Sequence, residues 1–231
     1  MFPFRRMDAS QALGLALNNL AWARRAVGGE AGPGGAACRD VLEEALGRFR
    51  AAGDRSGEAL TLAHLGHLAR SHGDPDRARA QLEAALALRQ ELGERRDAGL
   101  VMLGLALVDG GAGDLAAARR TFAAALRRFE ATDDLPAMAG SRLDWAIVEE
   151  RCGDLERARD LYAAGAAVWS AQRLPRNEAW GKVGHAAVLD ALDDRAAADA
   201  VRAQARTAFT ALGDGLGIAT LDAQEALSTT R

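Results

Sequence analysis

Residues 62–85 read LAHLGHLARSHGDPDRARAQLEAA, and this stretch contains the pattern that decides the fold. The pair Gly73-Asp74 divides it into two segments of similar length. Apolar residues on both sides recur three and four positions apart: Leu62, Leu65 and Ala69, then Ala78, Leu82, Ala85 and Leu86. This is the spacing of one face of an α-helix. Glycine suits the left-handed end of a helix, and the aspartate after it can cap the next one. The stretch therefore predicts two helices joined by a tight turn.

The same turn recurs along the chain with a period of 40 residues. Gly-Asp pairs follow at Gly113-Asp114 and Gly153-Asp154, and Asp193-Asp194 keeps the spacing. A second series of turn residues lies halfway between them: Gly53, Gly93, Asp133, Arg173 and Gly213. A fixed period of this length is typical of stacked helix-turn-helix units. No segment alternates between apolar and polar residues over the length of a strand, so we expect no sheet.

Small side chains recur at fixed positions in both helices of the unit. Gly66, Ala106, Ala146 and Ala186 share one position of the first helix, and Ala78, Ala118, Ala158 and Ala198 share one position of the second. A large residue usually follows the second position by four: Leu82, Phe122 and Tyr162. Small residues at both positions predict that the two helix axes approach closely, with the large residue filling the gap beside them.

With these elements the chain resembles the tetratricopeptide repeat family. The motif reads Leu62-x2-Leu65-Gly66 with Ala78-x3-Leu82-x2-Ala85, and it returns as Met102-x2-Leu105-Ala106 with Ala118-x3-Phe122-x2-Ala125 and as Arg142-x2-Trp145-Ala146 with Ala158-x3-Tyr162-x2-Gly165. The resemblance covers residues 12–213. The period of 40 exceeds the family's usual 34, and long repeats of this kind are similar to the C-terminal sensor repeats of large bacterial transcription activators.

The resemblance implies an all-α fold, a right-handed α-solenoid of five helix-turn-helix repeats with a C-terminal capping helix. We expect an N-terminal tail over residues 1–11 and a single superhelical domain over residues 12–231. The expected repeats and cap are 12–53, 57–93, 97–133, 137–173, 177–213 and 216–228. Gly99, Gly104, Gly110 and Gly111 weaken the first helix of the third repeat, so residues 99–113 should show the fastest hydrogen exchange.

In the family the first helix of each repeat lines a concave groove. Carried over by spacing, the candidates in the first two repeats are Asn18, Asn19, Trp22, Arg25, Leu60, His64, His67 and Arg70. Those in the later repeats are Leu103, Leu107, Asp144, Ile147, Glu150, Arg151, Trp180, Val183 and Asp190. Trp145 and Trp169 fall at core positions instead. A face of this mixed character favours a peptide or a small polar ligand over a polyanion.

No pattern in the sequence favours catalysis, a metal or a cofactor. His64 and His67 share a helical face but have no further metal ligands at suitable spacing. Adjacent carboxylates such as Glu149-Glu150 point in different directions on a helix and do not make an acid/base pair. The glycines of residues 28–35 lack the lysine of a phosphate-binding loop. We therefore predict no catalytic residues, no metal ligands and no cofactor.

Composition excludes further classes. A net charge of −3 argues against direct nucleic-acid binding, and no apolar run is long enough to span a membrane. Two cysteines, Cys38 and Cys152, are too few for a disulfide framework and fit a reducing compartment. These features, with the lack of a signal peptide, predict a cytoplasmic protein.

Two functions remain open from the sequence. The first is a non-catalytic scaffold or regulatory module that binds a protein or peptide in the groove. The alternative is a small-ligand sensor domain of a bacterial transcriptional regulator, and an enzyme is the least favoured reading. The leucine-rich opening helix favours contact with a further domain or with a second copy of the chain, as a homodimer through an exposed solenoid end.

Overall fold

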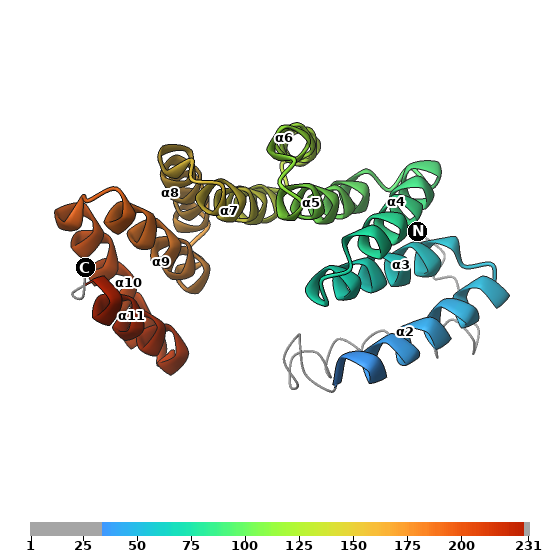
Figure 1. Cartoon of the computed structure of the whole chain (residues 1–231), viewed down its shortest axis with the longest axis horizontal. Helices are drawn as coiled ribbons and strands as arrows, with labels where there is room; N and C mark the ends of the chain where they lie inside the picture. The colour runs from blue at the N-terminus through green and yellow to red at the C-terminus, as the bar shows by residue number, and fades with distance from the viewer. Residues whose placement is uncertain (1–33, 229–231) are drawn as a thin grey trace, which may run out of the picture. The chain divides into compact units, whose positions relative to one another are not determined.

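The computed structural model describes residues 34–228, and these residues form ten consecutive α-helices without a strand (Figure 1). The helices are α2 (Gly34–Ala51), α3 (Arg55–Ser71), α4 (Pro75–Glu91), α5 (Arg95–Gly111), α6 (Leu115–Glu130), α7 (Leu135–Arg151), α8 (Leu155–Ala171), α9 (Pro175–Ala191), α10 (Arg195–Leu212) and α11 (Gly215–Ser228). The all-α fold of helix-turn-helix repeats is confirmed. In this register α3, α5, α7 and α9 are first helices of repeats, and α2, α4, α6, α8 and α10 are second helices.

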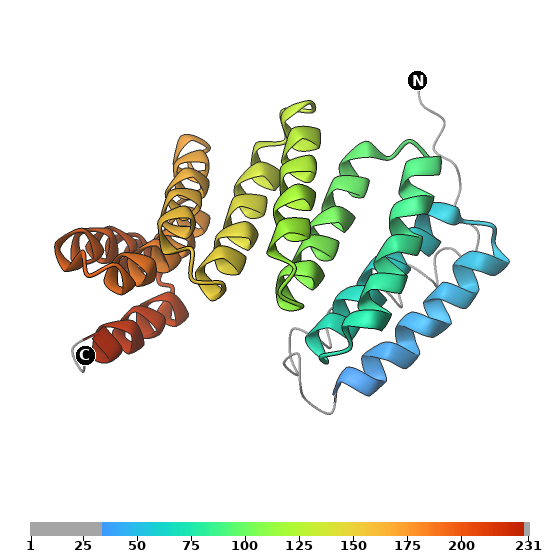
Figure 2. The ribbon, with the colours of Figure 1, turned by 45° about the horizontal axis from the view of Figure 1, so that its top comes forward.

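The described helices fall into two compact units, which divide between Ala112 and Gly113. Unit 1 contains α2 to α5, and Figure 2 shows α2, α3 and α4 as neighbouring rods within it. Unit 2 contains α6 to α11. The boundary lies inside the expected third repeat, between its first helix α5 and its second helix α6. That residues 12–231 form a single domain stays a prediction.

The turns have the predicted chemistry. Glycines at the predicted helix ends, such as Gly73 and Gly153, have positive φ angles, and so do Asp133, Arg173 and Asp193. The aspartates that follow cap the next helices through their side chains. For example, Asp74 accepts a hydrogen bond from the Arg77 backbone N–H at 3.0 Å. These local interactions satisfy N–H groups that a helix start otherwise leaves unpaired.

Close packing at the small positions builds the core of each unit. Ala78 and Leu82 of α4 are fully buried, and a β-carbon on Gly66 would lie 2.7 Å from Leu82 Cγ. Glycine therefore lets α3 approach α4 until the leucine fills the space beside it. In unit 2, Phe122, Tyr162 and Phe209 are buried large side chains of second helices. The predicted core positions of Trp145 and Trp169 are confirmed, since both are less than 10% exposed.

Helix α11 packs against both helices of the fifth repeat, as predicted for residues 216–228. Its Leu221 is fully buried in a cluster with Val183 of α9 and Phe209 of α10. The buried Asp214 accepts a hydrogen bond from the Gly217 backbone N–H at 3.1 Å and pairs with Arg176 of α9 at 2.9 Å. These contacts fix the position of α11 beside α9.

Candidate functional site

One side of each unit is formed by the first helices of the repeats. Helix α3 contacts α5 in unit 1, and α9 contacts both α7 and α11 in unit 2. Among the described helices of each unit, no two second helices come within contact distance of one another. Because the first helices lie closer together than the second helices, each unit curves toward its first-helix side.

The residues on this side recur with the period of the repeat. In unit 2 they are Gly140, Asp144, Ile147 and Arg151 of α7, Ala187 and Ala191 of α9 together with Trp180 and Gly184, and Thr220, Gln224 and Leu227 of α11. All are partly or fully exposed. We call this set the first-helix face of unit 2. Three of the four residues that α9 contributes are glycine or alanine, so the backbone of α9 is thinly covered at the centre of this face.

Gly184 shows why the centre of this face needs small residues. A β-carbon on Gly184 would lie 2.4 Å from Tyr162 Cε1, so the tyrosine ring occupies the space beneath the glycine. The Tyr162 hydroxyl donates a hydrogen bond to Glu150 Oε2 at 3.0 Å. Burial, together with the nearby negative charge of Glu150, raises the pKa of Tyr162 well above its usual value. The ring therefore supports the face as a neutral phenol.

Of the sequence-predicted residues of unit 2, four lie on this face: Asp144, Ile147, Arg151 and Trp180. Val183 is buried instead, in the cluster with Leu221 and Phe209. Ile147 is 42% exposed, Arg151 is exposed, and Asp144 is partly buried. Trp180 packs edge-on against Phe209, with ring centroids 5.2 Å apart. The indole therefore belongs in part to the core of the fifth repeat.

The predicted residues of unit 1 divide between face and interior. His64, His67, Arg70 and Leu107 are partly buried, whereas Leu103 is only 8% exposed. A β-carbon on Gly104 would lie 2.9 Å from His67 Cε1, which places His67 of α3 against α5.

Asn18, Asn19, Trp22 and Arg25 lie outside the described residues, as does the glycine-rich loop apart from its last positions. The part of the chain that the structure describes contains no group of three or more potential metal ligands.

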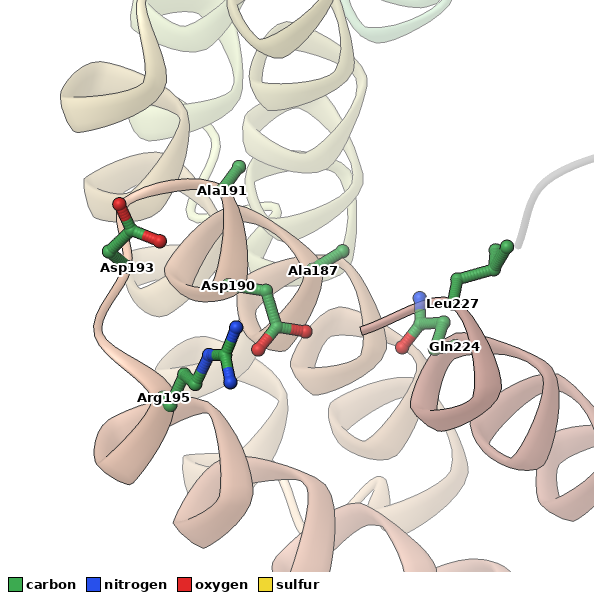
Figure 3. A pocket seen from close by; sticks show the side chains of 7 residues that line it. All are labelled: Ala187, Asp190, Ala191, Asp193, Arg195, Gln224 and Leu227. Atoms are coloured by element: carbon green, nitrogen blue, oxygen red, sulfur yellow. The ribbon is translucent and has the colours of Figure 1, made fainter. Parts of the chain in front are cut away.

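A hollow of about 220 Å³ opens between α9 and α11 on the first-helix face (Figure 3). Its lining consists of Ala187, Asp190 and Ala191 of α9, Asp193 and Arg195 at the turn into α10, and Gln224 and Leu227 of α11. The position of Asp190 on this side was predicted by spacing. The contributions of Asp193, Arg195 and α11 were not, because a turn and a helix outside the five repeats fall outside the groove pattern.

The sequence analysis also missed a charged cluster on the opposite side of α7. Glu149 is fully buried, and its carboxylate accepts hydrogen bonds from Arg119 Nε at 2.8 Å and from Trp145 Nε1 at 2.7 Å. Arg157 lies 3.2 Å from the same carboxylate, with its guanidinium 4.8 Å from the centre of the Trp145 ring. This cluster joins α6, α7 and α8, so its role is to hold the face in place from behind.

His185 is the titratable group of α9 with a shifted pKa. Burial lowers the pKa of His185, and the positive charge of Arg159 lowers it further. The imidazole is therefore neutral at physiological pH and adds no positive charge to α9.

No protein-family model matches the chain, and no curated protein matches it in sequence. Solved structures match its fold. Aspartyl phosphate phosphatase F from Bacillus subtilis has a TM-score of 0.79 at 11% identity, over 95% of this chain and 57% of that one. A Rap protein complexed with Competence and Sporulation Factor has a TM-score of 0.78 at 9% identity, over 94% of this chain and 59% of that one. A putative kinesin light chain from Podosopora anserina with nearly identical TPR-like repeats has a TM-score of 0.66 at 15% identity, over 90% and 100% of the two chains.

The chain has the fold of tetratricopeptide-like repeats. The matched structures share 9 to 15% of their residues with it, so the likeness is one of fold. This tetratricopeptide-like chain spans less than two thirds of the length of the first two proteins. No helix of residues 34–228 is both long enough and apolar enough to cross a membrane.

Proposed function

We propose that the chain is a non-catalytic regulatory module that binds a peptide or protein segment on the first-helix face of unit 2. The observation that carries this proposal is the arrangement of α7, α9 and α11. Their partly or fully exposed residues form a continuous side. Its centre, on α9, carries mainly glycine and alanine, and its edges, on α7 and α11, carry mainly larger side chains. An occupant can approach the α9 backbone closely there and contact Asp144, Ile147 and Arg151 along α7.

The Rap structure supports this proposal at the level of fold, because that protein is complexed with Competence and Sporulation Factor. The exposed Ile147 gives the face an apolar anchor between charged neighbours, which suits a peptide with an apolar side chain. As further parts of this proposal, the partner is a protein or peptide, with no direct contact to nucleic acid, and the chain acts in the cytoplasm.

The small-ligand sensor is the weaker alternative. Sites for drug-sized ligands measure about 300–1,000 Å³ and enclose most of the ligand. The hollow between α9 and α11 measures about 220 Å³, which fits one side chain of a larger partner better than a whole metabolite.

Selection of peptides from a random display library on the purified chain tests the proposal. The variant Ile147→Glu should weaken binding of a selected peptide by about tenfold or more, since burying an isoleucine contributes about 1.5–3 kcal/mol and a charge there opposes burial. Ile147 suits this test better than Trp180, whose removal would also disturb its contact with Phe209.

Leu212→Glu is the matched control. Leu212 is 46% exposed, close to the 42% of Ile147, but it ends the second helix α10. The control should bind selected peptides like the original chain. If the library yields no peptide, or if both variants lose binding equally, the first-helix face is not the binding site.

A further inference from the structure

The lining of the hollow between α9 and α11 is rich in hydrogen-bond acceptors. Asp190 and Asp193 contribute carboxylates, and Gln224 contributes its amide oxygen. Arg195 is the sole cationic group among the seven lining residues. Figure 3 shows the Asp190 carboxylate and the Gln224 amide facing each other across the hollow.

The Gln224 amide has an unused acceptor. Its Nε2 donates a long hydrogen bond to the Val183 carbonyl oxygen at 3.4 Å, so the nitrogen end of the amide faces Val183 of α9. Its Oε1 is buried and has no hydrogen-bond partner within the described part of the chain. An acceptor removed from water without a partner carries a desolvation penalty. Binding of a donor to this oxygen is therefore favourable, because it removes that penalty.

Asp190 is held in place from behind. Arg202 of α10 is 3% exposed, and its guanidinium is paired with the carboxylates of Asp190 and Asp199. The Asp190 side chain keeps 20% of its surface exposed, so one side of it remains open to the hollow. A carboxylate fixed in this way is pre-positioned for a donor, because binding does not need to order it again.

The surrounding helices are acidic. Residues 175–228, which form α9 to α11, contain eight acidic and five basic residues. Their excess of three negative charges equals the net charge of the entire chain, −3. A cationic group is therefore attracted to this end of the face.

The remaining walls are apolar. Ala187 and Ala191 line the α9 side and Leu227 the α11 side. Long basic side chains have this combined character, since their methylene stems lie along apolar surface while the charged head remains among polar groups. The volume of about 220 Å³ limits the occupant to one such side chain.

We propose that this hollow binds an arginine or lysine side chain of the partner peptide. The stem lies along Ala187, Ala191 and Leu227, and the head donates hydrogen bonds to Gln224 Oε1 and to the Asp190 carboxylate. Asp193 adds negative charge at the rim, and Arg195 opposes binding. This inference rests on the proposed function, because it assigns the chemistry of one residue of the peptide.

Amide chemical shifts of the full chain, titrated with N-acetyl-arginine methylamide, test the hollow without any selected peptide. The shifts should concentrate on Ala187, Asp190, Ala191 and Gln224. The neutral analogue N-acetyl-citrulline methylamide should bind at least severalfold more weakly, and N-acetyl-glutamate methylamide should leave these amides unchanged.

Two variants set the sign of the electrostatic effect. Asp193→Asn should weaken binding of the arginine probe about two- to fivefold, and Arg195→Gln should strengthen it by a similar factor, as expected for exposed charges. Asparagine tolerates the positive φ of 62° at position 193, so the turn should keep its shape. Asp133→Asn is the matched control, because Asp133 has a φ of 51° in a comparable turn but does not line the hollow.

The outcomes separate this inference from the proposed function. If a selected peptide binds through Ile147 but the arginine probe shifts no amide of the hollow, the assignment of a basic side chain is wrong while the binding face stands. If the arginine probe binds in the hollow but no peptide is selected, the hollow binds a basic group, and the proposed peptide binding is the part that fails. Tighter binding of the glutamate analogue, or weaker arginine binding in Arg195→Gln, would overturn the inference.

Discussion

The carboxylate of Glu149 accepts two hydrogen bonds from Arg119, which lies 30 residues earlier on the neighbouring helix α6. Arg119 Nε lies 2.8 Å from one carboxylate oxygen and Arg119 Nη2 lies 2.6 Å from the other. The carboxylate is fully buried, whereas the Arg119 side chain is 35% exposed. The contribution of this pair to the stability of the fold therefore comes mainly from giving the buried Glu149 carboxylate its hydrogen-bond partners.

We predict that Arg119→Met lowers the free energy of unfolding by about 3 kcal/mol, because it leaves a buried carboxylate with only part of its compensation. The double variant Arg119→Met/Glu149→Leu should recover most of the loss, since an apolar pair replaces a buried ion pair at little cost. Urea unfolding of the two variants checks this. A double variant that is no more stable than Arg119→Met would contradict the attribution of the loss to the unpartnered carboxylate.

The close approach of Gly184 to Tyr162 predicts a steric effect. Gly184→Ala should destabilise the chain by about 1–3 kcal/mol, because its β-carbon would overlap the tyrosine ring and force it to shift. Gly140→Ala is the matched control on the same face, since no atom lies within 4 Å of its added β-carbon. There, the helix preference of alanine should stabilise by about 0.5–1 kcal/mol. Thermal unfolding that moves both variants in the same direction contradicts the close-packing argument.

The turns and helix positions could be predicted from the sequence because their determinants are local. Asp74 caps a helix that starts one residue later, and Gly73 takes the backbone angle of its own turn. Buried charges could not be predicted in this way, because an isolated charged residue is normally a surface residue. Arg89 is 6% exposed at a position where Phe129 and Trp169 stand in later repeats.

One signal for buried charge was present in the repeat pattern. Arg79 pairs with the buried Asp109 at 2.7 Å, and Arg119 pairs with Glu149 in the same register, 40 residues later. A basic residue followed by an acidic residue 30 positions on, twice at the repeat period, marks a pair that joins neighbouring repeats. The hollow left no comparable signal, since α11 lies outside the five repeats and its contact with α9 is a tertiary feature.

Arg173 has a φ of 57°, in the turn where three of the other four repeats have glycine. A residue with a side chain pays about 1–2 kcal/mol in this left-handed conformation. We predict that Arg173→Gly stabilises unit 2 by about 0.5–1 kcal/mol, after the greater chain entropy of glycine is subtracted. Differential scanning calorimetry would measure the gain as a higher melting temperature. A lower melting temperature would mean that the arginine side chain makes a stabilising interaction greater than the strain.

Glycines weaken α5 more than its counterpart one period later. Gly104 is required by its contacts with Leu82 and His67, whereas Gly111 has no atom within 4 Å of an added β-carbon. We predict that backbone amides of residues 99–113 exchange with solvent faster than those of residues 139–153, and that Gly111→Ala slows this exchange. Hydrogen–deuterium exchange measured by mass spectrometry checks both statements. Equal protection of the two segments would contradict the effect of glycine on α5.

Tyr162 is the single tyrosine of the chain, so its ionisation can be followed without ambiguity by tyrosinate absorbance. Burial, aided by the negative charge of Glu150, raises its pKa above the ordinary value of 10.0. A folded-state pKa above that of the unfolded chain stabilises the fold fully below pH 10, and this contribution is lost as the pH rises further toward the folded-state pKa. We predict a titration midpoint well above 10 in the native chain and about 10 in urea.

Glu150→Gln should lower the native midpoint of Tyr162, yet leave it above 10 because burial is the larger cause. A native midpoint equal to that in urea would show that the ring beneath Gly184 is open to water.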